Sequence, residues 1–354
     1  MGRIRQLLCA ALALSTFAAF AQGNADRLAA AVREGGRVVV YAATDRDIVQ
    51  PVLDAFEAQH PGVRIDYHDM NSAEVYRRVV AEAEQGRHEV DVVWSSAMDL
   101  QVKLVNDGYA QPYRSAETAA LPAWAVWKDE AFATSYEPAA IVYSKRALGP
   151  YEVPDTHAAL IRLLAEQPDR FRGRVATYDP VRAGLGLLLH SQDALANPTA
   201  FWQLARALGG RQVELHVKTA VVLDRIASGE VLIGYNLLGS YAHSRARLDP
   251  NVGVVWPRDY TLVLSRVAFV ARRAPHPAAA RLWLDFLLSA QGQVLLARAG
   301  LFSVREDASD AAGLRQQLGT AFRPIALGTA LLAYLDQVKQ RDFLREWEAA
   351  MRKP

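Results

Sequence analysis

Polar side chains follow four apolar runs of this sequence, at the points where a helical pattern of apolar residues begins. The runs are RVVVYAAT, VDVVWSS, VATY with the loop DPVRAGLG after it, and VLIGY with an asparagine after it. The polar residues at these places are Thr44, Asp45, Ser95, Ser96, Tyr178, Arg182, Tyr235 and Asn236. Hydroxyl groups and free backbone N–H groups at a helix start can hold an anionic or polar ligand. We predict that these eight residues line a ligand cleft, because strand ends meet at one edge of an open α/β sheet.

Each of these places also has a purely structural interpretation. Ser, Thr, Asp and Asn are the preferred helix caps, and Ser96 with Asp99 three residues later is a capping-box-like pattern. Four such places, two in each half of the chain, favour a cleft over a set of unrelated caps.

Arg182 is the residue of the set best suited to hold an anion. Its guanidinium can pair with both oxygens of a carboxylate or phosphate group, and it lies in a glycine-containing loop before a helix. The alternative is a solvated loop arginine.

Asp45 is expected to accept hydrogen bonds from ligand hydroxyls, or to cap the helix that follows it.

Familiar catalytic and metal-binding signatures are missing from the sequence. It has no GxSxG, HExxH, P-loop or CxxC motif, and its eight histidines show no metal-ligand spacing. Together with the four polar strand ends described above, these absences favour a binding protein over an enzyme, with no cofactor and no metal site. Two carboxylates that meet only in space leave no mark in a sequence, so a hydrolase or transferase on the same scaffold is the alternative, and turnover of a substrate would distinguish it.

Apolar runs and helical patterns alternate along two stretches of the chain. The expected strands are 37–44, 64–69, 90–95, 174–178, 214–218, 231–235 and 252–256. This alternation predicts mostly parallel sheets with helices on both faces. Extended pieces near 132–144 and the apolar run 262–271 lack helices between them, which is typical of strands that cross between two lobes.

We accordingly expect lobe 1 to comprise residues 25–135 and 262–310, and lobe 2 to comprise residues 144–258. The C-terminal helices within 311–354 are expected to pack on lobe 1. There is no internal repeat and no low-complexity segment.

The first 21 residues have the pattern of a secretory signal peptide. Arg3 and Arg5 precede the apolar segment 7–20, and Ala19-Phe20-Ala21 is a cleavage pattern, so we predict a mature chain that begins at Gln22. The single cysteine falls inside this segment, so the mature protein has no disulfide.

The mature chain carries 38 basic and 38 acidic residues, a balance that does not suggest nucleic acid or a membrane surface as a partner.

Several longer segments resemble one known family. They are VVVYAATD, DAFEAQHPGVRIDY, DVVWSSAMDLQVKLVNDGYA, IVYSKRAL, GRVATYDP, GEVLIGYNLLGSYA and PHPAAARLWLDFLLSAQGQVLLARAG. With these segments, nearly the whole mature chain is similar to the periplasmic solute-binding proteins of ABC importers, in the cluster that contains ferric-ion and phosphorylated-sugar binders. The resemblance implies an α/β fold of the periplasmic binding protein type (type II), with two lobes joined by hinge strands, a ligand cleft between them and closure by hinge bending.

The sequence departs from the ferric-ion members of this cluster at one place. Those members have adjacent tyrosines in lobe 2, whereas this chain reads YNLLGSY at 235–241. The resemblance implies a protein that delivers its ligand to an ABC permease in the inner membrane, and we expect it to be a periplasmic monomer. The hydroxyl, amide and arginine side chains of the candidate set suit a small organic anion, such as a phosphorylated sugar, a phosphonate or a carboxylate. The alternatives are a ferric-ion-binding protein of an iron importer, and a component that presents its ligand to a membrane sensor kinase.

Overall fold

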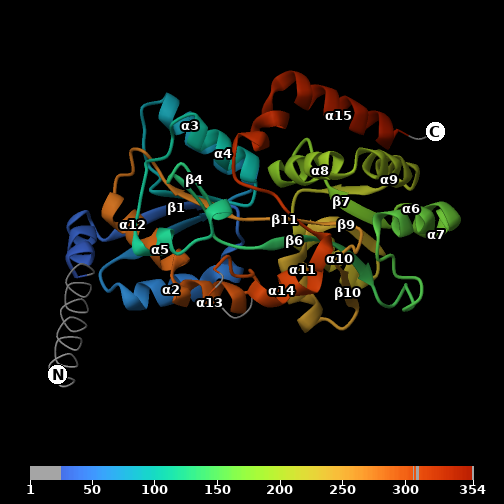
Figure 1. Cartoon of the computed structure of the whole chain (residues 1–354), viewed down its shortest axis with the longest axis horizontal. Helices are drawn as coiled ribbons and strands as arrows, with labels where there is room; N and C mark the ends of the chain where they lie inside the picture. Colours follow the sequence, from blue (N-terminus) through green and yellow to red (C-terminus); the bar gives the residue numbers. More distant parts are fainter. Residues whose placement is uncertain (1–24, 306, 308–310, 353–354) are drawn as a thin grey trace, which may run out of the picture.

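A computed structural model describes residues 25–305, 307 and 311–352. The predicted signal peptide at 1–21 lies outside the described residues. Among the described helices, none is long and apolar enough to cross a membrane. The chain forms two α/β lobes side by side, which confirms the predicted fold class (Figure 1).

Lobe 1 is organised around a sheet with the strand order β2-β1-β3-β12-β5-β4. Its strands are β1 (Arg37–Ala42), β2 (Arg64–Asp69), β3 (Val92–Ser95), β4 (Val126–Trp127), β5 (Ala131–Ala133) and β12 (Val267–Val270). Strands β2, β1 and β3 are parallel, and the helices that follow them are α2 (Arg46–Gln59), α3 (Ser72–Glu84) and α4 (Met98–Asn106). Because parallel strands end at the same edge, all three helices begin at that edge.

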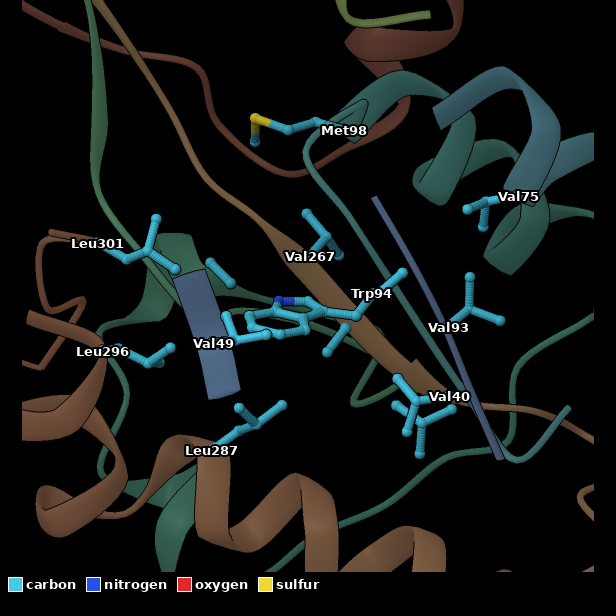
Figure 2. Packing of buried hydrophobic residues seen from close by; sticks show 14 of the residues in the cluster. Val40, Val49, Val75, Val93, Trp94, Met98, Val267, Leu287, Leu296 and Leu301 are labelled. Atoms are coloured by element: carbon cyan, nitrogen blue, oxygen red, sulfur yellow. The ribbon is translucent and has the colours of Figure 1, made fainter. Parts of the chain in front are cut away.

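The core of lobe 1 surrounds Trp94 in the middle of its sheet. The indole ring is fully buried, and its N–H donates to Thr134 Oγ1 at 2.9 Å. Figure 2 shows Val49 of α2, Val267 of β12 and Leu287 from the C-terminal half of the chain around this ring. Residues far apart in the sequence therefore bury one continuous apolar cluster, which is the main stabilising term for such a lobe.

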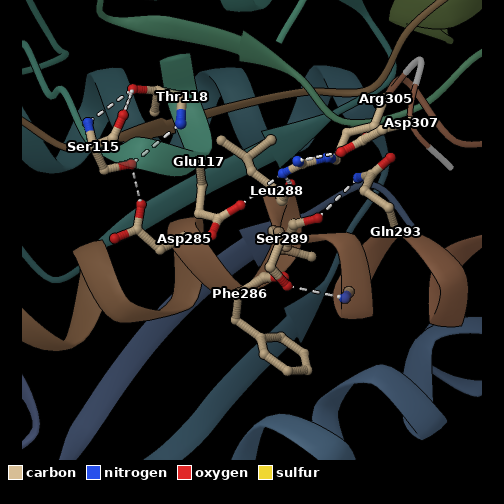
Figure 3. Close-up of polar contacts among 12 residues, drawn as sticks. Ser115, Glu117, Thr118, Asp285, Phe286, Leu288, Ser289, Gln293, Arg305 and Asp307 are labelled. Carbon is tan, nitrogen blue, oxygen red and sulfur yellow. Dashed lines mark hydrogen bonds and ion pairs between the residues drawn. The ribbon is translucent and has the colours of Figure 1, made fainter. Parts of the chain in front are cut away.

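The second half of lobe 1 returns to this core after lobe 2 has been completed. It contains α12 (Pro277–Leu288) and α13 (Ala290–Arg298), which pack beside α5 (Ala116–Ala119) and α2. Polar contacts fix this return, since Ser115 Oγ donates to Asp285 and Arg305 pairs with Glu117 at 2.6 Å (Figure 3).

Lobe 2 is organised around a sheet with the order β13-β11-β6-β9-β7-β8, and β10 also pairs with β6. Its strands are β6 (Glu137–Ser144), β7 (Val175–Tyr178), β8 (Glu214–His216), β9 (Ile233–Leu238), β10 (Val252–Val255), β11 (Thr261–Leu264) and β13 (Phe322–Pro324). Its helices are α6 (His157–Glu166), α7 (Pro168–Phe171), α8 (Gly184–Ala196), α9 (Pro198–Gly210), α10 (Thr219–Ser228) and α11 (Gly239–Leu248). Strands β8, β7 and β9 are parallel, so α8, α10 and α11 also begin at one shared edge.

The apolar run at 262–271 is not one continuous crossing strand. It is divided at Ser265 and Arg266 into β11, which belongs to the sheet of lobe 2, and β12, which belongs to the sheet of lobe 1. The chain also passes between the lobes through the segment that joins β5 to β6.

The C-terminal segment contains α14 (Ala311–Leu318), a 3-10 helix η3 (Thr329–Leu335) and α15 (Gln337–Met351). We expected these helices on lobe 1, and this expectation is wrong for α15. While η3 lies against α4 in lobe 1, α15 lies against α9 of lobe 2, above α8 and α9 in Figure 1. Phe343 and Trp347 of α15 pack on Phe201, and an amphipathic stripe in a sequence does not say which lobe it will cover.

Candidate functional site between the lobes

A pocket between the two lobes is lined by residues at the ends of strands and the starts of helices. We call it the interlobe pocket; its cavity volume is about 50 Å³. Residues that line it at helix starts are Asp45, Asn71 and Ser96 from lobe 1 and Ala183, Lys218 and Leu238 from lobe 2. Its walls are in contact, because a Cβ atom added at Gly184 in lobe 2 would lie 2.8 Å from Leu100 Cδ1 in lobe 1. The two lobes are therefore closed on each other.

Six helices of the described chain begin at this pocket, namely α2, α3, α4, α8, α10 and α11. In five of them the residue before the helix makes no side-chain cap; only Asn71 caps its helix, α3. The first N–H groups of a helix have no partner within the helix and carry a partial positive charge. Their convergence on one pocket produces a positive field without many basic side chains.

The predicted residues of lobe 1 lie at this pocket. Asp45 and Ser96 line it, and Thr44 and Ser95 are buried next to them. The main-chain N–H of Asp45 donates to the hydroxyl of Tyr241 in lobe 2 at 3.2 Å, so this contact joins the lobes directly. Ser96 does not cap α4, because that helix begins at Met98 and the residue before it is Ala97.

Tyr178 and Arg182 of lobe 2 differ in where their side chains lie. Tyr178 is fully buried at the end of β7, where its hydroxyl hydrogen-bonds to Thr219 Oγ1 and accepts from the N–H of Leu238. It thereby positions two residues that line the pocket. Arg182 is exposed to solvent next to Ala183 and does not line the pocket; its pairing with a ligand stays a prediction.

Tyr235 and Asn236 do not lie at the interlobe pocket, which corrects our expectation for both. The asparagine suggested the end of the strand, but β9 continues to Leu238, so both residues lie inside the sheet. Asn236 adopts a positive φ of 57° at an irregularity of the pairing, where Tyr235 and Asn236 of β9 lie opposite the single residue Ile141 of β6. The strand end that reaches the pocket is Leu238, followed by Tyr241 in the first turn of α11.

Tyr235 belongs to a buried polar group in the interior of lobe 2, which we call the lobe 2 cluster and which comprises His157, Asp193, Tyr235 and Tyr260. The hydroxyls of both tyrosines donate to the Asp193 carboxylate, and the His157 ring stacks on Tyr260 at 4.1 Å. The cavity beside the cluster measures only about 10 Å³, on the order of one water molecule. This cluster is a structural network and not a place for a solute.

Most residues that line the interlobe pocket were not predicted, and Asp69, Lys218 and Tyr241 are among them. Asp69 ends β2 and Lys218 precedes α10, so both follow the same pattern of a polar residue at a strand end that marked the other candidates. Tyr241 follows no such pattern, because it lies inside a helix.

A buried ion pair lies beneath the pocket, where the chain crosses between the lobes. Arg266 Nε is 2.7 Å from Glu137 Oε1, and both side chains are fully buried. The same guanidinium donates to Thr44 Oγ1 of lobe 1, while Glu137 accepts from the hydroxyl of Ser240 in lobe 2. Burial alone would lower the pKa of Arg266, but Glu137, together with Tyr241 and Tyr67, outweighs burial and raises that pKa above its usual value, so the arginine stays charged.

A larger cavity of about 310 Å³ lies at the opposite edge of lobe 1, between the ends of α3 and α4. Helix ends of this kind present carbonyl groups with partial negative charge. Its arginines, Arg87, Arg272 and Arg273, complement that charge. It is lined by lobe 1 alone, so closure of the two lobes does not shape it.

The family model of bacterial extracellular solute-binding proteins matches residues 38–302, which is most of the chain. The chain belongs to this family. A solved substrate-binding protein of an ABC transporter from Agrobacterium tumefaciens is 36% identical, with a TM-score of 0.86, over 89% of this chain and 94% of that one. A search of curated proteins finds no match. The protein is therefore a solute-binding protein of the ABC transporter type, and its family and fold are those of binding proteins and not of enzymes.

More distant structures share the fold. They include iron-bound HitA from Pseudomonas aeruginosa, with 14% identity and a TM-score of 0.72 over 89% of this chain and 99% of that one. The ferric binding protein from Campylobacter jejuni has 16% identity and a TM-score of 0.69 over 88% and 99% of the two chains. In the described part of the present chain, no group of three or more His, Cys, Asp or Glu side chains is placed to hold a metal ion.

Proposed function

We propose that the interlobe pocket captures a small organic anion in the periplasm and that the protein, as a monomer, delivers it to an ABC permease in the inner membrane. The observation that carries this proposal is the convergence of six helix N-termini on one pocket that both lobes form. Each such terminus corresponds to roughly half a positive charge, and a closed pocket with little water strengthens its effect.

Lys218 is the cation that we expect to contact the anion. It lines the pocket, and within the described structure its side chain makes no hydrogen bond or ion pair. Arg182 lies next to the pocket but outside its lining, so we propose a smaller, longer-range contribution for it.

The size of the pocket favours the smaller ligand classes. A cavity of about 50 Å³ has room for roughly four water-sized groups. A carboxylate or phosphonate of a few carbon atoms fits such a space after a small opening of the lobes, whereas a phosphorylated sugar requires a wider one.

A thermal-shift screen of small carboxylates, phosphonates and sugar phosphates, with ferric citrate included, tests the proposal. A true ligand at a hundred times its dissociation constant should stabilise the protein by about 2.7 kcal/mol. Calorimetry should then show one site per chain. Stabilisation by ferric citrate alone, with no effect of any other anion, would contradict the proposal and favour an iron-binding protein.

A further inference from the structure

The charged side chains that line the interlobe pocket are not distributed evenly between its two walls. Lobe 1 contributes two carboxylates, Asp45 and Asp69, and lobe 2 contributes one ammonium group, Lys218. The side chains therefore give the lining a net negative charge, although the helix N-termini favour an anion. One wall attracts positive groups and the other attracts negative groups.

The lobe 1 carboxylates have free acceptor capacity. Within the described contacts, the Asp45 carboxylate accepts no hydrogen bond, since the Asp45 contact to Tyr241 is made by its main-chain N–H. Asp69 uses one oxygen to accept from the N–H of Arg46 at 3.2 Å, and its other oxygen has no partner among the described residues.

Lys218 does not satisfy these carboxylates across the pocket. It is near enough to Asp69 to lower the pKa of that carboxyl, yet it forms no ion pair with it. Burial, with the charges of Asp45 and Asp47 added to it, outweighs the hydrogen bond from the Arg46 N–H and the charge of Lys218, so the pKa of Asp69 is raised above its usual value. The negative wall therefore lacks a cation even though the lobes are closed.

We propose, on the basis of the function proposed above, that the ligand is a small zwitterion, an organic anion that also carries a protonated amine. Its anionic group lies against Lys218 and the starts of α8, α10 and α11 in lobe 2. Its ammonium group lies against Asp45 and Asp69 in lobe 1. A simple anion of the same size would place its charge near two carboxylates that only the helix starts of lobe 1 offset in part, so the pocket selects for the amine.

Matched pairs of probes test this selectivity by calorimetry. Suitable pairs are β-alanine with propionate, taurine with ethanesulfonate, and phosphoethanolamine with ethyl phosphate, since the members differ mainly in the amine. We expect at least one amine-bearing probe to bind about tenfold or more tightly than its partner, as a charge-assisted hydrogen bond provides.

Three variants test whether the carboxylates of lobe 1 cause the preference for the amine-bearing probe. Asp45→Asn and Asp69→Asn should each weaken binding of the amine-bearing probe about tenfold and leave its amine-free partner within about threefold. Asp54→Asn is the control, because Asp54 is an exposed carboxylate of α2 that does not line the pocket and is not among the charges that act on Asp69. It should leave both probes unchanged.

The outcomes separate this inference from the function on which it rests. The proposal of a zwitterionic ligand is wrong if the amine-free probes bind as tightly as their partners, or if only amine-free anions bind in the wider screen. The proposal that the pocket binds an organic anion is not contradicted by either result. If no probe and no anion of the wider screen binds, both the zwitterion proposal and the proposed anion-binding function are wrong.

Discussion

The interlobe pocket and the lobe 2 cluster are both polar, but their polar groups are satisfied in different ways. In the lobe 2 cluster the Asp193 carboxylate accepts from two tyrosine hydroxyls, and the cavity beside it measures about 10 Å³. In the interlobe pocket Asp45 and Lys218 have no side-chain partner among the described residues, and the starts of six helices face a cavity of about 50 Å³.

Whether a polar group already has a partner therefore distinguishes structural residues from ligand-binding residues better than residue type does. Buried polar groups that already have partners stabilise a fold, because an unpaired buried group would be costly. Polar groups without partners that line a cavity leave hydrogen-bonding capacity for a ligand. Substitutions in the cluster should therefore change stability, and substitutions at the pocket should change binding.

The largest effect is expected for Asp193→Ala in the lobe 2 cluster. It leaves the buried hydroxyls of Tyr235 and Tyr260 without an acceptor, so we expect the free energy of unfolding to fall by about 3–5 kcal/mol. Urea unfolding measures this loss. Asp193→Asn, which keeps one oxygen acceptor, should lose less. An unchanged urea midpoint for Asp193→Ala would show that the cluster is not structural.

The next effect concerns His190, another buried polar group of lobe 2, which stacks on Trp347 of α15. Burial lowers the pKa of its imidazole to about 4. The unfolded chain binds this proton near pH 6.5, so the stability that neutral His190 contributes is present above that pH and is lost as the pH falls toward 4. At pH 5 the loss should be about 2 kcal/mol relative to neutral pH.

The variant His190→Gln removes this titrating group. Its free energy of unfolding should change less between pH 7 and pH 5 than that of the wild type. Equal pH dependence of wild type and His190→Gln would contradict the assignment.

At the interlobe pocket, Lys218→Ala should weaken binding of the ligand by about 1.5–3 kcal/mol, on the order of tenfold to a hundredfold. Its stability without ligand should change by less than about 0.5 kcal/mol, as is usual for exposed side chains. Arg182→Ala is the matched variant, and calorimetry should show a smaller loss for it. A larger loss for Arg182→Ala than for Lys218→Ala would make Arg182 the residue that pairs with the anion.

The smallest effect is expected for Tyr241→Phe, which removes only the hydroxyl that accepts from the Asp45 N–H across the lobes. A neutral hydrogen bond contributes about 0.5–1.5 kcal/mol, so affinity should fall by roughly two- to tenfold. Calorimetry measures the affinity, and a thermal melt without ligand should be unchanged. A lower melting temperature with unchanged affinity would assign the hydroxyl to the fold instead.

Much of the architecture could be predicted from periodicity, because the spacing of apolar residues differs between a strand and a helix. The strands expected at 64–69, 174–178 and 252–256 are found as β2, β7 and β10, with ends that differ by at most one residue. Strand β9 could not be placed as well, since all six of its residues are buried and Asn236 interrupts its apolar run. The position of α15 was also not predictable, because the partner of an amphipathic helix is decided by surfaces elsewhere in the chain.

The candidate site was predictable only in part. The rule that polar residues at strand ends line the cleft selected Asp45 and Ser96, and the same rule applied to the strands at 64–69 and 214–218 would have added Asp69 and Lys218. It also selected Tyr235 and Asn236, because an error of three residues in a strand end moves a residue from the pocket into the sheet. Tyr241 reaches the pocket only through the orientation of α11, which the sequence does not reveal.

The most direct test is to prevent closure of the lobes and measure binding. Gly184 begins α8 in lobe 2, and a Cβ atom there would lie 2.8 Å from Leu100 Cδ1 and 3.5 Å from Ala97 Cβ, both in lobe 1. Gly184→Leu should hold the lobes apart without disturbing either core, whereas Gly210→Leu in α9 is the control because no atom lies within 4 Å of its added Cβ.

Calorimetry with the ligand found in the screen should show no measurable binding to Gly184→Leu and wild-type binding to Gly210→Leu, with both variants folded at the wild-type melting temperature. Wild-type affinity of Gly184→Leu would contradict the claim that the ligand is held between the closed lobes.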